Sequence, residues 1–419
     1  MPNKQHSTTI SLPRGTLDLT YQTNFSGDSK NYELEDLLGF AQRINPKRAF
    51  LFVSKVLGRH IPVAPGTMRH AFTDLANLVP DDLPEPILVI GMAETAVGLS
   101  AGVHQALQTR YPNALLLNST RHAQHNDDNT ETLLTTFSED HSHASQHLIY
   151  QSADTVTQAQ LLASKTLIMV DDEASTGNTC VNVVTALRNA GLDQLQQVHL
   201  TTLVDWSLNQ NQSHANADDT IATRLSNIEF HRHHLLSGAW QWTDAPNPEP
   251  ITMPSVDTTE AGSYALGDTG NWGRFPTLDS TDGFAFYLTK FQAAFNLFNQ
   301  QAQSEKASFE KEQLPQRILV LGSNEFVWLP FLLAEWLETQ TQNATVKFSA
   351  LTRSPIALGG AITTMLSFSD NYGLGMTNFA YNVEPSDWDL IVLCVETSAD
   401  SVDEMWKDLD NVLVVSPTL

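Results

Sequence analysis

The chain has few basic residues for its length. Its 419 residues include 23 Lys and Arg against 47 Asp and Glu, which gives a formal net charge of -24. Non-specific binding to nucleic acid depends on Lys and Arg that neutralise phosphates, so this balance argues against nucleic acid as a partner. A phosphorylated small molecule would have to be bound by local backbone amides, a few basic side chains and a divalent cation.

Cysteine and long apolar segments are also scarce. The two cysteines, Cys180 and Cys394, stand far apart in the sequence, a pattern that a reducing compartment tolerates and that is no disulfide framework. The first eleven residues lack the apolar core of a signal peptide, and no apolar run approaches the ~18 residues of a membrane span. We therefore expect a cytoplasmic protein with no membrane partner.

Short apolar runs alternate with stretches of helical period, which predicts an α/β fold with a mostly parallel, Rossmann-like sheet. The length favours two domains. A segment rich in Pro, Asp, Thr and Gly at 238–273 indicates their connection. We expect a first domain at 1–245, a linker at 246–272 and a second α/β domain at 273–419. The clearest expected strands are 87–90, 114–117, 167–170, 198–204, 318–321, 346–350, 390–395 and 412–415, and the clearest helices are 93–107, 179–189, 283–303 and 329–338.

The two halves share short motifs in the same order, which predicts that the second is a divergent copy of the first. The sequence ILVIGMAE at 87–94 matches ILVLGSNE at 318–325, and a Thr-Arg pair follows each at a similar distance. A Phe-Ser motif that leads to a tyrosine comes next in both halves, and then an apolar strand. This alignment puts Cys394 and Val395 opposite Asp171 and Asp172, so we expect the second copy to lack the acidic pair.

An acidic and glycine-bearing segment follows the strand at 167–170. The strand ends in Asp171-Asp172-Glu173, and Ser175-Thr176-Gly177-Asn178-Thr179 leads into a helix. Carboxylates at the carboxyl end of a parallel strand lie where open α/β sheets bind ligands. The amides, hydroxyls and helix N-terminus of the following turn form an anion site. Together they fit a ribose 5-phosphate, with a cation-binding loop or a simple helix cap as the alternatives; a P-loop is excluded here because Gly-Lys-Ser/Thr is missing.

The pattern over 167–179 resembles the phosphoribosyl diphosphate signature of type I phosphoribosyltransferases. The resemblance implies that Asp171 and Asp172 hold the ribose hydroxyls and stabilise an oxocarbenium-like state. It also implies Mg²⁺ bound through the substrate, with these two acids as candidate ligands. The 5-phosphate would be held by Ser175, Thr176, Gly177, Asn178 and Thr179.

Enzymes of this type resemble one another in two further features. One is a loop after an earlier strand whose backbone amides bind the diphosphate, and the other is a basic residue on a loop that closes over it. Residues Met92, Ala93, Glu94 and Thr95 occupy the first place, and Arg121 is the expected clamp. A plain strand-to-helix turn and a solvated surface arginine are the structural alternatives.

Several other polar residues are candidate substrate contacts. The basic patch of Lys55, Arg59 and His60 would face the phosphates or the acceptor base from an N-terminal hood, or else carry exposed cations on a strand and turn. His141 and His143 lie in a histidine-rich stretch that ends at His147, for which metal binding and packing are the alternatives. We expect the histidines at 231, 233 and 234 to be solvated.

Most of the chain resembles the phosphoribosyltransferases of bacterial tellurite-resistance clusters. Their C-terminal domain is named for the residues Thr-Arg-Ser-Pro, which stand here at 352–355, and the motifs at 273–275, 322–325 and 379–383 resemble others of that domain. The usual spelling Thr-Glu-Glu-Phe is Ser-Asn-Glu-Phe at 323–326, so the first of these acids is missing. We expect Thr352, Arg353 and Ser354 to contact an anion or substrate, or to cap a helix.

The reaction implied is displacement of diphosphate from C1 of phosphoribosyl diphosphate by a ring nitrogen of a base, or its reverse. The family resemblance implies a role in making a nucleoside-like metabolite of a stress response, and a homodimer is compatible with it. The sequence leaves the base open. It also leaves two other classes open: a binding or regulatory protein that has lost catalysis, and a hydrolase or phosphorylase that acts on a finished nucleotide.

Overall fold

The computed structural model describes residues 5–23, 32–44, 48–122, 133–138, 146–208, 221–248, 250–256, 269–305, 315–341 and 343–418. These residues form two compact units, each assembled from separate stretches of the chain. Unit 1 is Met1–Phe40, Arg69–Pro250 and Asn271–Ser280, and unit 2 is Ala41–Met68, Ile251–Gly270 and Thr281–Leu419. The compact units therefore do not follow the linear division at 245 and 273, because the stretch from Ala41 to Met68 packs with the C-terminal half.

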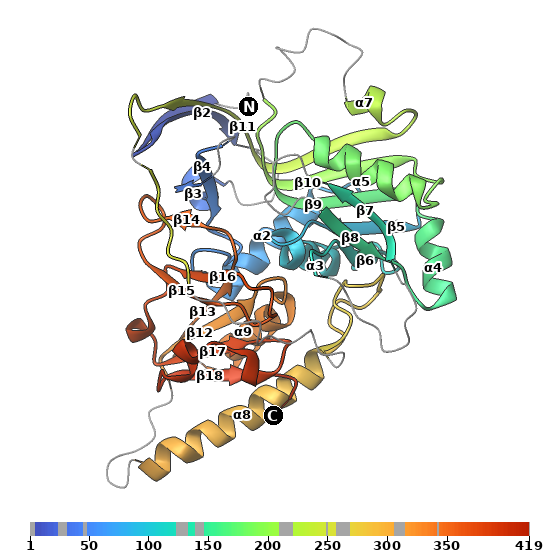
Figure 1. Cartoon of the computed structure of the whole chain (residues 1–419). Coiled ribbons are helices and arrows are strands. Elements are labelled where there is room, and N and C mark those ends of the chain that lie inside the picture. Colours follow the sequence, from blue (N-terminus) through green and yellow to red (C-terminus); the bar gives the residue numbers. More distant parts are fainter. Residues whose placement is uncertain are drawn as a thin grey trace. The chain divides into compact units, whose positions relative to one another are not determined.

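Unit 1 is built on a mixed sheet whose described strands run in the order β1-β2-β11-β10-β9-β5-β6 (Figure 1). The strands from β11 to β6 pair in parallel, whereas β2 pairs antiparallel with β11 and β1 with β2. The predicted α/β class with a mostly parallel sheet is confirmed. The strands are β1 (Gln5–Leu12), β2 (Gly15–Thr23), β5 (Ile87–Gly91), β6 (Leu115–Asn118), β9 (Thr166–Ala174), β10 (Gln197–Asp205) and β11 (Glu229–Asp244).

Helices and a hairpin pack around this sheet. Helix α3 contacts β5, β6 and β9, and it packs closely on α2, since a Cβ at Gly102 would lie 2.1 Å from the ring of Phe72. The helices expected at 93–107 and 179–189 are confirmed as α3 and α5. The described helices are α1 (Leu34–Leu37), α2 (Pro65–Asn77, mostly in unit 1), α3 (Ala96–Leu107), α4 (Thr155–Leu162), α5 (Asn178–Asn189) and α7 (Ile221–Arg224), and the hairpin is β7 (Leu133–Ser138) with β8 (Gln146–Tyr150).

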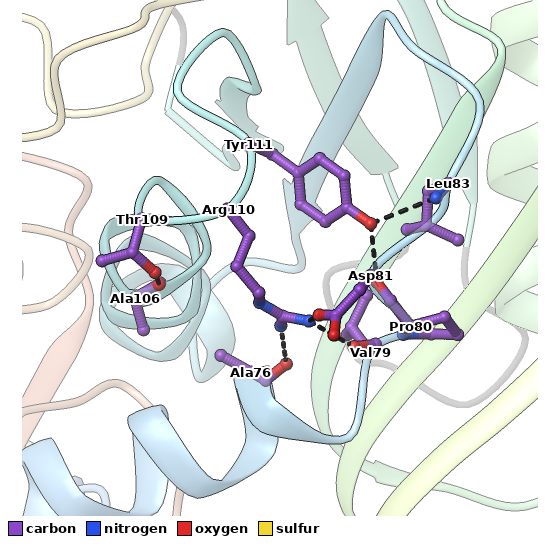
Figure 2. A network of polar contacts seen from close by, with 9 residues as sticks. All are labelled: Ala76, Val79, Pro80, Asp81, Leu83, Ala106, Thr109, Arg110 and Tyr111. Carbon is purple, nitrogen blue, oxygen red and sulfur yellow. Dashed lines mark hydrogen bonds and ion pairs between the residues drawn. The ribbon is translucent and has the colours of Figure 1, made fainter.

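A polar network fixes the loop that enters β5, as Figure 2 shows. Arg110 donates hydrogen bonds to the carbonyl oxygens of Ala76 at 2.6 Å and Val79 at 2.7 Å, and it also pairs with Asp81. The hydroxyl of the adjacent Tyr111 donates to the carbonyl of Pro80 at 2.6 Å and accepts an amide N–H further along the loop. A carbonyl in the last turn of α2 and one just beyond it are thus satisfied by a side chain that follows α3.

Unit 2 contains a parallel sheet in the order β13-β12-β17-β18. The buried hydroxyl of Tyr287 joins α8 to this sheet through the carbonyls of Val395 at 3.0 Å and Val415 at 2.8 Å. All the strands and helices expected here are present. The bounds are β12 (Arg317–Ser323), β13 (Thr345–Leu351), β17 (Leu390–Cys394), β18 (Val412–Val415), α8 (Phe284–Glu305), α9 (Trp328–Gln340) and α10 (Glu404–Lys407).

Smaller elements complete unit 2. One is a sheet in the order β14-β3-β4, and another is the antiparallel hairpin of β15 and β16. Across both units, none of the helices in the described ranges is long and apolar enough to span a membrane. The remaining bounds are β3 (Leu38–Arg43), β4 (Phe50–Ser54), β14 (Ile356–Ala357), β15 (Met365–Ser369), β16 (Thr377–Tyr381) and the 3-10 helices η3 (Pro385–Asp387) and η4 (Ala399–Ser401).

The two units repeat one arrangement, as the shared motifs predict. The order β6-β5-β9-β10 in unit 1 has the same connections as β13-β12-β17-β18 in unit 2, and each unit inserts a hairpin before its third strand. Even an isolated bridge recurs, because Thr120 pairs with Leu148 and Thr352 with Phe379. The second half is therefore a topological copy of the first.

The strand register corrects the motif alignment by one residue. Gly91 of β5 pairs with Val170, and its equivalent Gly322 of β12 pairs with Cys394. Counting two residues from each partner, Asp172 corresponds to Glu396 and not to Val395. The expectation that unit 2 lacks both acids is therefore wrong, because one of the two is retained as a glutamate.

Candidate functional site

The acidic pair lies where β9 extends beyond the neighbouring strand β5. Pairing with β5 ends at Val170, whereas pairing with β10 continues as far as Ala174. Asp171 and Asp172 are thus the first residues of β9 that have no partner strand on the β5 side, and both are half-buried. The crevice beyond the carboxyl ends of adjacent parallel strands is where open α/β sheets bind ligands.

The acids of this strand end interact closely. Asp171 accepts the amide N–H of Asp172 at 2.9 Å, and Glu173 accepts the indole N–H of Trp206 at 3.2 Å. Burial, and then the charge of Glu173, raises the pKa of Asp172 to about 6. Its negative charge is therefore costly at this position, and hydroxyl donors or a cation would offset that cost. The described residues contain no group of three or more His, Cys, Asp or Glu that could hold a metal by themselves.

The turn after the acids needs its glycine. Gly177 adopts φ +78°, and it precedes the first turn of α5. A Cβ at this position would lie 2.4 Å from Cδ1 of Ile221, so both the backbone conformation and the space favour glycine. The turn places the N-terminus of the twelve-residue α5 just after the carboxyl end of β9, which is an arrangement suited to an anion.

Two arginines flank this turn, and the sequence motifs did not reveal them. Arg232 binds both carboxylate oxygens of Asp205 at 3.0 and 3.1 Å and donates to the carbonyl of Ser175 at 3.3 Å. Arg224 donates to the side-chain oxygen of Asn178 at 2.6 Å. These contacts join residues 57 and 46 positions apart, so no local pattern could have signalled them.

The second expected loop lies at the carboxyl end of β5, on the same edge of the sheet. Met92 and Ala93 are buried, and Glu94 and Thr95 are half-buried. The N–H of Ala93 donates to Oγ of Ser119 at 3.0 Å, which fixes this loop to the end of β6.

Arg121 is linked to that loop through a buried histidine. Oγ of Ser119 lies 2.9 Å from Nδ1 of His147, and Nε2 of the same ring lies 3.4 Å from Nη2 of Arg121. Phe137 stacks on the imidazole with a centroid distance of 4.6 Å. In the sequence His147 is only the end of a histidine-rich stretch, and its spacing gives no sign of this bridging position. His141 and His143 lie outside the described residues.

The basic patch belongs to unit 2. Arg59 and His60 are buried, so the alternative of exposed cations is wrong for these two; Lys55 is half-buried. Arg59 donates to the carbonyl of Asn324, and the carbonyl of His60 accepts the side-chain amide of Asn382 at 2.8 Å.

The Thr-Arg-Ser motif and the other histidines also have defined places. Thr352 is buried at the carboxyl end of β13, where its Oγ1 accepts the N–H of Ser354 at 3.1 Å, and Arg353 is half-buried. Of the histidines expected to be solvated, His231 is exposed, whereas His233 and His234 are half-buried.

The family models agree with this geometry. Residues 37–238 match the family described as phosphoribosyl transferase, and residues 290–412 match the TRSP domain, described as C-terminal to it. The chain belongs to the phosphoribosyltransferases with a C-terminal TRSP domain. In this phosphoribosyltransferase the acidic pair, the Gly177 turn and the Met92–Thr95 loop share one edge of the unit 1 sheet.

Solved structures of adenine phosphoribosyltransferases are similar to the chain at low identity. The enzyme from Trypanosoma brucei, in complex with AMP, pyrophosphate and ribose-5-phosphate, is 14% identical with a TM-score of 0.33; the match covers 55% of this chain and 86% of that one. The Leishmania donovani enzyme is 14% identical, with a TM-score of 0.31 and coverages of 49% and 78%. The Giardia lamblia enzyme, complexed with 9-deazaadenine, is 12% identical, with a TM-score of 0.29 and coverages of 48% and 96%. No curated protein matches the chain.

Proposed function

We propose that unit 1 transfers ribose 5-phosphate between phosphoribosyl diphosphate and a ring nitrogen of a base. One observation carries the proposal: Asp171 and Asp172 extend beyond the end of β5, directly before the Gly177 turn at the N-terminus of α5. A ligand whose phosphate binds at the turn, and whose vicinal hydroxyls lie a few ångströms from that phosphate, would bring these hydroxyls within reach of the two carboxylates. Ribose 5-phosphate has this shape.

Each part of the site has a role in this reaction. Residues 175–179 hold the 5-phosphate through backbone N–H groups and hydroxyls. Arg224 and Arg232 fix that turn through hydrogen bonds to Asn178 and Ser175. Asp171 and Asp172 accept hydrogen bonds from the ribose hydroxyls and stabilise the positive charge that develops on the ring. The loop of 92–95, which the Ala93–Ser119 hydrogen bond fixes, and the guanidinium of Arg121 hold the diphosphate as its bond to C1 breaks and the bond from the base nitrogen forms.

The residues present fit a magnesium ion that arrives with the substrate. Mg²⁺ keeps most of its ligands from water and phosphate oxygens and needs only one or two protein carboxylates. Asp171 and Asp172 supply such a pair, and the raised pKa of Asp172 indicates a carboxylate whose charge a cation would stabilise. When bound, the ion neutralises charge on the diphosphate.

The wider setting is proposed from the motif resemblance. The product would be a nucleoside-like metabolite connected with tellurite or stress resistance, made in the cytoplasm by a chain that forms a homodimer. Its small-molecule partners would be phosphoribosyl diphosphate and a base that remains to be identified.

The test is turnover by the purified full chain. We would incubate it with phosphoribosyl diphosphate, Mg²⁺ and single nitrogenous bases, and follow diphosphate by ³¹P NMR. Asp172→Asn should lower kcat/KM about 100-fold or more, since removal of one stabilising group of this kind has effects of that size. The control is Asp193→Asn, which changes an exposed acid near the start of β10, at the opposite edge of the sheet.

The products separate the alternatives. Diphosphate formed together with a base-linked ribose 5-phosphate supports the transferase. Binding of phosphoribosyl diphosphate without turnover of any base would point to a regulatory protein. Release of a free base from a nucleotide, with water or phosphate as the acceptor, would point to a hydrolase or phosphorylase.

A further inference from the structure

Buried polar side chains gather at the carboxyl edge of the unit 2 sheet, in the place where unit 1 carries its proposed site. They come from the end of β12, from the residues just after β12 and β17, and from β16 and the segment that connects it to β15. All are at most 5% exposed. The group comprises Ser323, Asn324, Asn371, Asn378, Glu396 and Thr397.

Much of this edge corresponds residue by residue to the unit 1 site. The bridges Thr120–Leu148 and Thr352–Phe379 align Arg353 with Arg121 and Asn378 with His147. The register of β12 and β17 aligns Glu396 with Asp172. In both units the hydroxyl of this threonine accepts a backbone N–H: Thr120 accepts that of His122 at 3.0 Å, and Thr352 accepts that of Ser354 at 3.1 Å. Unit 2 thus keeps the equivalents of the diphosphate loop, the clamp and one acid.

The equivalent of the 5-phosphate turn is missing from unit 2. After Glu396 and Thr397 the chain forms the short 3-10 helix η4, which Ser398 caps by accepting the N–H of Asp400. Neither a left-handed glycine nor a long helix follows β17 there. A ligand of unit 2 would therefore be held at its diphosphate end and not at a 5-phosphate.

Two buried asparagines at this edge have side-chain amides whose hydrogen-bonding capacity is unmet within the described residues. Within the described part of the chain, neither polar side-chain atom of Asn324 or of Asn378 has a hydrogen-bond partner, although both residues are 0% exposed. Buried amides of this kind are rare because leaving them unbonded is costly. Asn324 also holds a left-handed φ of +54°, and its carbonyl accepts a hydrogen bond from the buried guanidinium of Arg59. The Asn324 amide and the Arg59 guanidinium thus meet at the equivalent of the diphosphate loop.

The surrounding hydrogen bonds join the end of β12, the residues after β17 and the segment between β15 and β16. Oγ of Ser323 donates to Oδ1 of Asn371 at 2.8 Å, and Nδ2 of Asn371 donates to Oγ1 of Thr397 at 2.8 Å. The hydroxyl of Tyr372 donates to Glu396 at 2.7 Å. The edge is therefore pre-organised, which lowers the entropy lost when a ligand binds.

We infer that unit 2 holds a second ligand site, which binds a small molecule through a diphosphate group. Arg353 pairs with the diphosphate, the amide groups of Asn324 and Asn378 donate to its oxygens, and Glu396 accepts a hydroxyl of the group attached to it. The inference goes beyond the proposed transferase activity, because it assigns a ligand to the TRSP domain and requires no turnover.

The test is calorimetry of the full chain with inorganic diphosphate and Mg²⁺ in an Arg121→Gln background, which weakens the unit 1 clamp. We expect Arg121→Gln to retain one diphosphate site. Adding Arg353→Gln should weaken that site about 10- to 100-fold, the usual effect of losing a charge-assisted hydrogen bond. The matched control adds Arg317→Gln, which removes a guanidinium paired with Asp389 at the amino end of β12 and should leave affinity unchanged.

A second variant guards against misfolding. Asn324→Gly removes the buried amide and retains the left-handed backbone, so it should weaken diphosphate binding with little change in the melting temperature. Affinity that is the same with and without Arg353→Gln, or no diphosphate bound by Arg121→Gln, would overturn the inference. Inorganic phosphate that binds as tightly as diphosphate would overturn the assignment to diphosphate. A chain that turns over no base can still pass this test, so its outcome is distinct from that of the proposed function.

Discussion

Oγ of Ser119 lies 2.9 Å from Nδ1 of His147 and accepts the N–H of Ala93 at 3.0 Å. The guanidinium of Arg121 can only donate hydrogen bonds, so its 3.4 Å contact with Nε2 assigns the imidazole proton to Nδ1. His147 therefore donates to Ser119 on one side and accepts from Arg121 on the other. This chain of contacts joins the proposed diphosphate loop to its clamp.

Removing the middle of this chain should weaken substrate binding. Ser119→Ala leaves the N–H of Ala93 and Nδ1 of His147 without their shared acceptor, so we expect KM for phosphoribosyl diphosphate to rise about threefold to tenfold, as for the loss of one or two neutral hydrogen bonds. Steady-state kinetics at saturating base checks this. The control is Ser164→Ala, which removes another buried hydroxyl whose own bond is a long 3.5 Å; equal kinetics in both variants would contradict the prediction.

The Gly177 turn gives a sharper prediction. In Gly177→Ala the new Cβ would lie 2.4 Å from Ile221 on a backbone in the left-handed conformation, so the turn must move. Activity should then fall about 100-fold or more, because the backbone amides that bind the phosphate lose their positions. Gly191→Ala is a matched control, since Gly191 also has a positive φ but a Cβ there meets only Leu162 at 3.5 Å. Both variants should lose about 1 kcal/mol of stability. An active Gly177→Ala enzyme would show that the turn does not bind substrate.

The central strands and helices were predictable because their signals are local. Apolar runs such as 87–90 and 167–170 lie in the middle of a sheet, buried on both faces, and such strands have a continuous apolar sequence. The acids at 171 and 172 were equally visible, since adjacent charges at the end of such a run mark the point where the strand leaves the core. The same kind of apolar run predicted all four strands of the second sheet, β12, β13, β17 and β18.

Other features depend on contacts between distant positions. Strand β1 alternates half-buried and exposed residues at the sheet edge, and the long strand β11 mixes polar and apolar residues between β2 and β10, so neither has a continuous apolar run. The Ala41–Met68 stretch packs in unit 2, although the chain before and after it belongs to unit 1. Arg224 and Arg232 became recognisable only once β11 was paired with β10. Glu396 was missed because motif alignment cannot fix a strand register to one residue.

The Arg110 network predicts a loss of stability without a loss of chemistry. Arg110→Met removes the donors to the carbonyls of Ala76 and Val79 in Figure 2. The free energy of unfolding measured in urea should therefore fall by about 1–3 kcal/mol, because this is the cost of leaving such groups unsatisfied. Activity per folded molecule should stay at the wild-type level. Arg188→Met, at an exposed position of α5, should change stability by less than about 0.5 kcal/mol; equal losses in both would exclude the network as the cause.

A stack of histidines between β10 and β11 predicts how stability depends on pH. His199 stacks on His231 at 4.8 Å and on His233 at 5.1 Å, and its Nδ1 lies 2.8 Å from Nε2 of His233. Burial, with neighbouring imidazoles adding to it, lowers the pKa of His199 to about 3 and that of His233 to about 4. His199 and His233 are therefore neutral in the folded protein at pH values where the unfolded chain already binds protons.

The sign of the effect follows from proton linkage. Below the unfolded histidine pKa of about 6.5 the unfolded state binds more protons than the folded state, so stability decreases as pH falls and continues to decrease down to the folded pKa values. Between pH 7 and pH 5 each buried imidazole should remove on the order of 1 kcal/mol. Urea midpoints at the two pH values measure this. His233→Gln should reduce the pH dependence, whereas His70→Gln, at an exposed position of α2, should not. If both variants keep the wild-type slope, the acid sensitivity arises at other groups.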